Sequence, residues 1–415
     1  MAEREAWIID GVRTPRGKGR PTGALHGVHP QELLGQCLNA LVERTGVTPT
    51  FVEDVIVGNG NTVGDHLGIG RLAPLAAGWP VEIPGFNLNR FCGSGQQAVT
   101  LAAMGVMSGL QDVVVAGGVE SMSRWPVDPA AAPPTIDGQN PAFRARHPVV
   151  PQGIAADLIA TLEGFSRQQC DALAVTSQER AAKALAEGRF ERSTVAVRAA
   201  DGTVVLDREE FPRPGTTLEG LAALPPSFAA MGSTRFEPFD RSFDELCLQT
   251  YPEIDAVDHV HHAGNSSGVV DGAAAILVTS SRFAQAHGLA PRARLCMAAT
   301  AGADPVIMLT APGPAARLCL EKAHMAIGDI DVWEINEAFA AVVLKAMRDL
   351  ELDPELVNPN GGAIALGHPI GATGAMLVLT ALDELERTDA ETALIAMCTG
   401  GGMGTATIIE RVERP

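Results

Sequence analysis

Several features are missing from this sequence of 415 residues, and each absence argues against a class of protein. No uncharged apolar run is long enough to span a bilayer, so we expect no membrane span. The seven cysteines include no CxxC pair, which argues against a zinc ribbon. Their odd number and wide scatter favour reduced thiols. The first residues lack the basic and apolar regions of a signal peptide, so we expect a cytoplasmic protein.

Positive charge is also scarce, since the chain has 31 Lys and Arg residues but 49 Asp and Glu residues, which gives a net charge of −18. This balance argues against a nucleic-acid partner, which needs a basic surface. An anionic ligand would need local cations, helix N-termini or backbone N–H groups to offset the acidic field. Apolar residues make up 46% of the chain, which is enough for globular cores, and the length predicts two or three domains.

What the sequence has in abundance is glycine-rich turns, and the most informative is Asn358-Pro-Asn-Gly-Gly-Ala-Ile-Ala-Leu-Gly-His-Pro-Ile-Gly-Ala-Thr-Gly374. Glycine allows positive φ and close approach of a ligand. Proline after His368 suits the start of a helix, whose dipole would favour the neutral imidazole. A neutral histidine on such a loop is what a general base needs.

Two cysteines occupy comparable positions. Cys92 lies in Asn89-Arg-Phe-Cys-Gly-Ser-Gly95 at an expected helix N-terminus, where the pKa of a thiol can fall well below its free value. Cys398 ends an apolar strand before Gly400-Gly-Gly402, whose N–H groups could hold an oxyanion. Either thiol could instead be an ordinary buried cysteine. Together with His368 they indicate thiol-based acyl chemistry.

Other polar residues are less decisive. Asn336 follows an apolar strand, where it could cap a helix or hold a water or a thioester oxygen. His259 and His261 would share one face of a strand, with His262 beside them, but the usual further metal ligands are lacking. We therefore expect no metal site.

Strands and helices alternate along both ends of the chain, which predicts βαβ units in a layered α/β fold. The expected strands are 6–12, 54–58, 112–118, 273–279, 292–300, 331–335 and 392–398, and the expected helices are 31–45, one from about 92, 153–163, 167–188, 312–324, 337–350 and 369–386.

The two halves repeat one order of elements, with a polar loop, then Cys92 or His368, a small-residue helix, an apolar strand and a glycine run. This order indicates an ancient duplication. The duplication would bring Cys92 and His368 together across a pseudo-twofold axis.

These motifs resemble those of the thiolase family, in family order and over nearly the whole chain. The matching segments are Asn89–Gly95, Gly117-Gly-Val-Glu-Ser-Met-Ser123, Gly264-Asn-Ser-Ser-Gly268, Asn336-Glu-Ala-Phe339, Gly361–Gly371 and Cys398-Thr-Gly-Gly-Gly402. The resemblance implies a duplicated five-layer αβαβα fold with an inserted loop domain. Its N-terminal domain would comprise residues 1–122 and 252–279, the loop domain that binds coenzyme A (CoA) and the acyl group residues 123–251, and the C-terminal domain residues 280–415.

The nearest likeness within the family is to degradative 3-ketoacyl-CoA thiolases. It implies that Cys92 attacks the 3-keto carbon, that His368 activates Cys92 and then CoA, and that Cys398 protonates the acetyl-CoA enolate. One oxyanion hole would use His368 and a water on Asn336, and the other the N–H groups of Cys92 and Gly400. Ser267 and Arg213 match CoA-contacting positions. CoA and its thioesters would be substrates, with no metal or redox cofactor.

The resemblance also implies a homodimer joined at sheet edges of the first domain, and it allows a hydratase/dehydrogenase subunit as a further partner. One departure concerns Gln152-Gly-Ile-Ala-Ala-Asp157, where many members have Met-Gly-x-Thr-Ala-Glu. That methionine lies by the acyl pocket, so the acyl preference of this chain stays open.

Three other functions compete with degradative cleavage. An acetyl-CoA acetyltransferase working in the condensing direction would use the same residues. A ketosynthase-type enzyme would surround its cysteine with two histidines, whereas the partners here are His368 and Cys398. A non-catalytic CoA- or lipid-binding scaffold is disfavoured because all four residues of the expected catalytic set are present.

Overall fold

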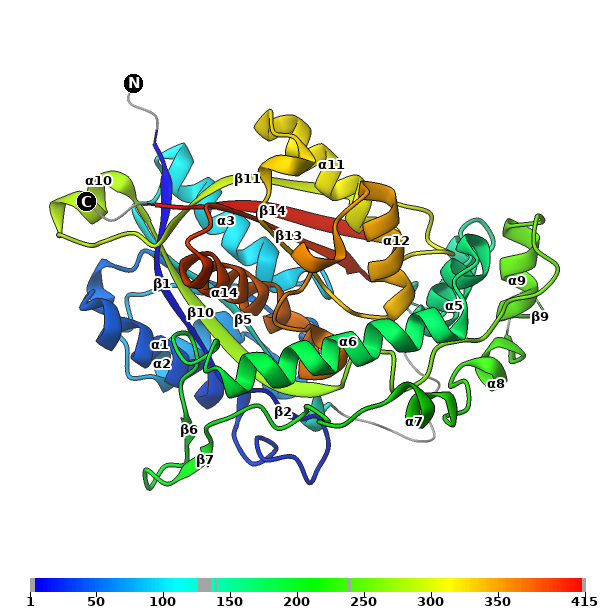
Figure 1. Ribbon diagram of the computed structural model, residues 1–415. Helices are drawn as coiled ribbons and strands as arrows, with labels where there is room; N and C mark the ends of the chain where they lie inside the picture. Colours follow the sequence, from blue (N-terminus) through cyan, green and yellow to red (C-terminus); the bar gives the residue numbers. More distant parts are fainter. Residues whose placement is uncertain (1–3, 126–135, 139, 237–239, 413–415) are drawn as a thin grey trace.

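A long mixed β-sheet runs through the middle of the molecule (Figure 1). The computed structural model describes residues 4–125, 136–138, 140–236 and 240–412. Within them the main sheet has ten strands in the order β12-β13-β14-β11-β1-β10-β5-β3-β4, with β2 paired to β10. The strands are β1 (Ala6–Arg13), β2 (Gly17–Lys18), β3 (Asp54–Gly58), β4 (Gly85–Leu88), β5 (Val113–Ser121), β10 (Val270–Ser280), β11 (Ala293–Gly302), β12 (Val332–Ile335), β13 (Thr392–Thr399) and β14 (Met403–Arg411).

The sheet consists of two halves with the same internal pairing. In the first half β1 pairs antiparallel with β10, β10 antiparallel with β5, and β5 parallel with β3. In the second half β11 pairs antiparallel with β14, β14 antiparallel with β13, and β13 parallel with β12. Only two residue pairs between β1 and β11 join the halves. The matching order and directions are those that the expected duplication predicts.

Helices cover both halves and fill the space between them, giving the predicted five layers (Figure 1). The outer face of the first half packs against α1 (Pro30–Thr45) and α2 (Ile69–Ala76). The outer face of the second half packs against α11 (Pro312–Ala323) and α12 (Ala340–Leu350). Between the halves lie α3 (Ser94–Ser108) and α14 (Ile370–Thr388), whose small residues suit burial on all sides. The duplicated α/β fold is therefore confirmed.

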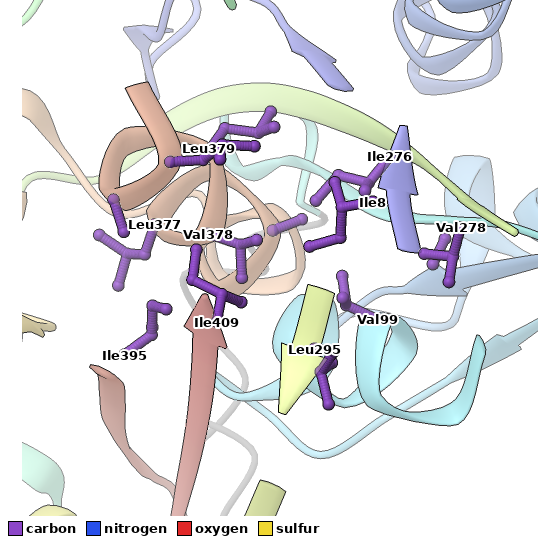
Figure 2. Close-up of a cluster of buried hydrophobic side chains, with 14 of the residues drawn as sticks. Ile8, Val99, Ile276, Val278, Leu295, Leu377, Val378, Leu379, Ile395 and Ile409 are labelled. Carbon is purple, nitrogen blue, oxygen red and sulfur yellow. The ribbon is translucent and has the colours of Figure 1, made fainter. Parts of the chain in front are cut away.

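The central core contains side chains from both halves (Figure 2). Ile276 of β10 and Ile409 of β14 belong to one buried cluster with Val99 of α3 and Leu379 of α14. Because the two central helices are packed on both sides, their ends are fixed relative to both sheet halves.

Glycines let the N-termini of the two central helices approach each other. A Cβ on Gly95 would lie 2.7 Å from the Gly371 carbonyl oxygen, and a Cβ on Gly118 would lie 2.0 Å from the same atom. Any larger residue would force these backbones apart. Gly95 lies three residues after Cys92 and Gly371 three residues after His368. The contact therefore brings the two candidate residues into the same region, as the duplication predicts.

A long segment between β5 and β10 packs against α12 of the second half, and its Val197 joins the outer core of the first half. Its longest helices confirm the predictions at 153–163 and 167–188, and its buried side chains form a cluster with α12 and Cys398. Residues 126–135, 139 and 237–239 of the predicted loop domain lie outside the described residues. The segment contains α4 (Pro141–Arg144), α5 (Gln152–Glu163), α6 (Arg167–Ala186), β6 (Val197–Arg198), β7 (Val204–Leu206), α7 (Leu218–Ala222), α8 (Ala229–Gly232), β8 (Arg235–Phe236), β9 (Arg241–Ser242) and α9 (Phe243–Thr250).

Some elements differ from the sequence predictions. The sequence predicts no strand after the glycine run that follows β13, but Gly401 and Gly402 have φ of 82° and 79° and form a turn into β14. The helix expected from 337 begins at Ala340. Short α10 (Ser281–Ala286) and α13 (Ala363–Leu366) complete the fold.

Among the described residues, no helix is both long and apolar enough to cross a membrane.

Candidate active site

Cys92 lies in a tight turn just before α3. Phe91 has a φ of 49°, a left-handed conformation that is uncommon for a bulky residue and is often found at functional sites. The Ser94 hydroxyl holds the turn, because it donates to the Phe91 carbonyl oxygen at 2.6 Å and accepts from the Arg90 N–H at 2.9 Å. The sequence therefore places the thiol at the N-terminus of α3, as predicted, on a strained backbone.

The charge state of Cys92 differs from the sequence expectation. Burial raises the pKa of its thiol to about 11, although hydrogen bonds from the Gly400 N–H and the Gln152 side chain act in the opposite direction. The expected lowering by the helix N-terminus is therefore wrong for the resting protein, because loss of solvent outweighs the dipole. Cys92 is a neutral thiol that needs a base.

The turn after β13 lies against the Cys92 turn. A Cβ on Gly93 would be 2.8 Å from Thr399 Cγ2, and a Cβ on Gly400 would be 3.2 Å from the Phe91 ring. Burial, and then the nearby Cys92, raise the pKa of the Cys398 thiol. The two candidate cysteines thus lie close enough to interact electrostatically, and both are protonated at neutral pH.

His368 lies between α13 and α14 with one ring nitrogen free. Its Nδ1 lies 2.5 Å from the Thr373 hydroxyl, and that hydroxyl donates to the Pro369 carbonyl oxygen at 3.0 Å. We therefore assign the ring proton to Nδ1, which leaves Nε2 as an unprotonated acceptor. Nε2 is buried without a hydrogen-bond partner.

The expectation of a neutral His368 is confirmed, but the cause differs from the one expected. Burial first, and the charge of Arg16 second, lower the pKa of His368 to about 4. The free Nε2 can therefore accept a proton across the neutral pH range.

Asn336 directly follows β12 and carries a side chain with no internal partner. Its N–H donates to the carbonyl oxygen of Ala396, two residues before Cys398, at 3.0 Å. Its Oδ1 and Nδ2 are both buried and unpaired, so the amide is available to a substrate or a water. Asn336 does not cap α12, which begins at Ala340.

The loop 264–268 connects the Asn336 motif to the His368 loop. The Ser267 N–H donates to the Ala338 carbonyl oxygen at 2.9 Å, and the Gly268 carbonyl oxygen accepts from the His368 N–H at 2.8 Å. Arg213 lies beside this loop and donates from Nη2 to the Ala263 carbonyl oxygen at 3.1 Å. The structure therefore places Ser267 and Arg213 on one side of the candidate site.

Two buried carboxylates that sequence reasoning missed hold these loops. Glu120, at the end of β5, accepts from the N–H groups of Gly60 and Gly371 at 2.7 and 2.9 Å, and burial raises its pKa to about 7. Glu337 accepts from the Ser177 hydroxyl at 2.6 Å and from Asn358 Nδ2 at 3.0 Å. Both residues lie inside sequence segments that resemble the thiolase family, and that position is the signal by which the sequence could have identified them.

The histidine cluster near the site is paired with carboxylates. His259 Nδ1 and His261 Nδ1 each lie 2.7 Å from an Asp157 carboxylate oxygen, and His262 Nε2 lies 2.8 Å from Asp171 Oδ1. Among the described residues, no three His, Cys, Asp or Glu side chains form a group that could hold a metal ion. The cluster fastens α5 and α6 to the segment that leads into the 264–268 loop.

Comparisons with known proteins show which family this chain is similar to. The thiolase N-terminal domain model matches residues 6–236, and the thiolase C-terminal domain model matches residues 289–411. A steroid 3-ketoacyl-CoA thiolase of Mycobacterium tuberculosis is 41% identical, covering 98% of this chain and 94% of its own. A β-ketoadipyl-CoA thiolase of Pseudomonas aeruginosa is 40% identical, over 99% of this chain and 100% of its own.

A solved structure of an acetyl-CoA acetyltransferase of Bacillus anthracis aligns with a TM-score of 0.83 at 35% identity, covering 99% of this chain and 100% of that one. The fold and the site thus define an acyltransferase. The chain belongs to the thiolase family.

The pKa of Cys92 generates a prediction about its reactivity. Alkylation of Cys92 by iodoacetamide should rise about tenfold per pH unit from about pH 7 to about pH 10, because the thiolate fraction grows that way below a pKa of about 11. Mass spectrometry of the Cys92 peptide measures the rate. The Cys92→Ser variant reports background alkylation at Cys296, which is partly exposed. A plateau already reached below about pH 8 would show a resting thiolate instead.

Proposed function

We propose that this protein is a degradative 3-ketoacyl-CoA thiolase, which cleaves a 3-ketoacyl-CoA with CoA into acetyl-CoA and a shortened acyl-CoA. The observation that supports it most is the meeting of two buried neutral thiols, Cys92 and Cys398, in the region that also holds a histidine with a free Nε2. One thiol would serve as nucleophile and the other as acid, with His368 as the base.

The first half-reaction transfers the acyl group to Cys92. His368 Nε2 takes the Cys92 proton while the sulfur bonds to the 3-keto carbon, and the carbonyl electrons move to oxygen. When the carbonyl re-forms, the bond between C2 and C3 breaks, and Cys398 gives its proton to C2 of the departing enolate. Acetyl-CoA leaves, and the imidazolium then passes its proton to the Cys398 thiolate.

The second half-reaction releases the product. His368 takes the proton of the CoA thiol, whose sulfur attacks the acyl-thioester carbon, and Cys92 leaves and recovers that proton. The N–H groups of Cys92 and Gly400 would stabilise one oxyanion, consistent with their effect of lowering the pKa of the Cys92 thiol. Protonated His368 and the unpaired Asn336 amide would stabilise the other.

CoA must bind although the chain carries a net charge of −18. Arg213 is exposed beside the 264–268 loop, with its guanidinium over the Phe211 ring at 5.2 Å from the centroid. A fixed guanidinium near backbone N–H groups would offset the acidic field for a phosphate-bearing ligand. We assign Arg213 and Ser267 to the CoA side of the site.

The names of similar proteins support two directions of the thiolase reaction, cleavage and condensation. The Mycobacterium and Pseudomonas relatives carry degradative names, which favours cleavage. A relative from Thiocystis violacea, 38% identical, is named acetyl-CoA acetyltransferase, as is the Bacillus structure, so condensation of two acetyl-CoA molecules is the second candidate.

The edge of the first sheet half supports a homodimer. Among the described strands, β4 pairs only with β3, and Phe86 on β4 is 43% exposed. Leu67 and Val81 on neighbouring segments are each 67% exposed. An exposed apolar edge strand is a ready surface for pairing with a second copy about a twofold axis. A hydratase/dehydrogenase partner is a further expectation of the resemblance.

Replacing Cys92 with serine tests the nucleophile. Cys92→Ser should lower kcat for thiolysis about 10³-fold or more, because a serine hydroxyl is a far weaker nucleophile beside the same base. The loss of 3-ketoacyl-CoA absorbance measures the rate, over short, long, branched and steroid side-chain substrates. Cys296→Ser, outside the site, is the matched control and should retain activity. Near-normal thiolysis by Cys92→Ser would remove Cys92 from this role.

Replacing Cys398 tests the acid. Cys398→Ala should abolish deuterium incorporation into the acetyl methyl group of acetyl-CoA in D₂O, because no group remains to move the α-proton. Cys92 should still be acylated, which a mass increase on the Cys92 peptide detects. Cys296→Ala should keep the exchange. Undiminished exchange in Cys398→Ala contradicts the assignment.

A charge at the sheet edge tests the dimer. Phe86→Glu should shift the protein from dimer to monomer at micromolar concentration, because a carboxylate would be buried without a partner at the interface. Sedimentation velocity measures the shift. Leu356→Glu, at a side chain 41% exposed in the second half, should leave the dimer unchanged. A monomeric native protein, or a dimeric Phe86→Glu variant, would exclude this interface.

A further inference from the structure

Gln152 is the first residue of α5 and comes from the long segment between the two sheet strands β5 and β10, far along the chain from Cys92. Its side-chain nitrogen Nε2 lies 3.5 Å from the position that a Cβ on Gly400 would occupy. Its side chain also acts to lower the pKa of the Cys92 thiol, against the larger effect of burial. Gln152 therefore lies at the meeting point of the Cys92 turn and the glycine run after Cys398.

Contacts at Gly153 and Asp157 hold the first turns of α5, the helix that carries Gln152. A Cβ on Gly153 would lie 2.3 Å from the Phe228 ring, so the start of α5 packs directly against that aromatic side chain. Asp157, five residues further on, accepts from His261 N–H at 2.9 Å and pairs with His259. A side chain on such an element keeps its position while chemistry takes place.

The chemical identity of this residue distinguishes the chain from the family pattern. Many thiolases have methionine where this chain has Gln152. A thioether has no N–H or O–H group to offer, whereas a glutamine amide donates from two N–H groups. The other groups that act to lower the pKa of the Cys92 thiol are the backbone N–H groups of Gly400 and of Cys92 itself.

We propose that Gln152 is a further catalytic residue, whose amide donates to the Cys92 sulfur and stabilises negative charge on it as the proton passes to His368. The inference rests on the proposed function in which Cys92 is the nucleophile. A donor to a buried developing anion has a strong effect because no solvent competes with it. The inserted segment then contributes directly to the reactivity of the nucleophile.

The experiment compares the native protein with Gln152→Met and Gln152→Glu. Methionine removes the donor, and glutamate also adds a negative charge beside the sulfur. Iodoacetamide alkylation of Cys92 should slow about tenfold at about pH 8 in Gln152→Met and more in Gln152→Glu. The pH profile should move to higher pH in the same order, since each change disfavours the thiolate. Gln31→Met, at the first turn of α1, is the matched control and should alkylate at the native rate.

The outcomes separate this inference from the proposed function, because alkylation requires no acyl-CoA substrate. Unchanged alkylation profiles in both folded variants, as judged by thermal unfolding, would overturn the inference even if the native protein catalyses thiolysis. Equal slowing by methionine and glutamate would also overturn it, since a packing role does not depend on charge. The graded shift supports it, even if the native protein cleaves none of the substrates tested. Thiolysis kcat/KM should fall with alkylation, with Gln152→Asn restoring part of both.

Discussion

The close contact between the N-termini of α3 and α14 is the constraint on which the site depends. Gly95 and Gly118 leave room for the Gly371 carbonyl oxygen, so the two helices meet with almost no side chain between them. Both helices are packed by the two sheet halves, so their first turns cannot move independently. Cys92 and His368 lie three residues before Gly95 and Gly371, so the contact also fixes the positions of these two residues relative to each other. Here the duplication of the fold generates a site at its pseudo-symmetric centre.

Burial then sets the chemistry of the groups that meet there. It raises the pKa of Cys92 and lowers that of His368, so both are neutral at rest. A neutral pair avoids the cost of a buried charge, and the proton moves only when a substrate can share the charge that forms. The backbone N–H of Gly400 and the amide of Gln152 lower the energy of the thiolate without creating a permanent ion pair. Cys92 and His368 therefore carry no charge before a substrate binds, but groups that stabilise a thiolate are already in place.

Buried carboxylates outside the reacting groups hold the loops in place. Glu120 bonds the N-terminal turn of α14 to the loop after β3, and Glu337 joins the asparagine motif to α6 and to the loop before His368. Each accepts several donors, which offsets the loss of solvent. Asp157 does the same for the histidine cluster, and its helix also carries Gln152. The insertion and the duplicated core are thus connected through hydrogen bonds close to the site.

Apolar runs, glycine turns and their repetition are local patterns, so the sequence alone determined the α/β class, the duplication and the placing of Cys92, His368 and Cys398 on glycine-rich turns, while the five layers followed from its resemblance to the thiolase family. It missed β14, because the glycines at 401 and 402 could equally end a fold or turn a chain back. Only the tertiary structure decided that burial outweighs the helix dipole at Cys92, that Glu120 and Glu337 hold the loops, and that Gln152 lies beside the glycine turn after Cys398. These depend on solvent exclusion and on contacts between residues far apart in the chain, which no local pattern specifies.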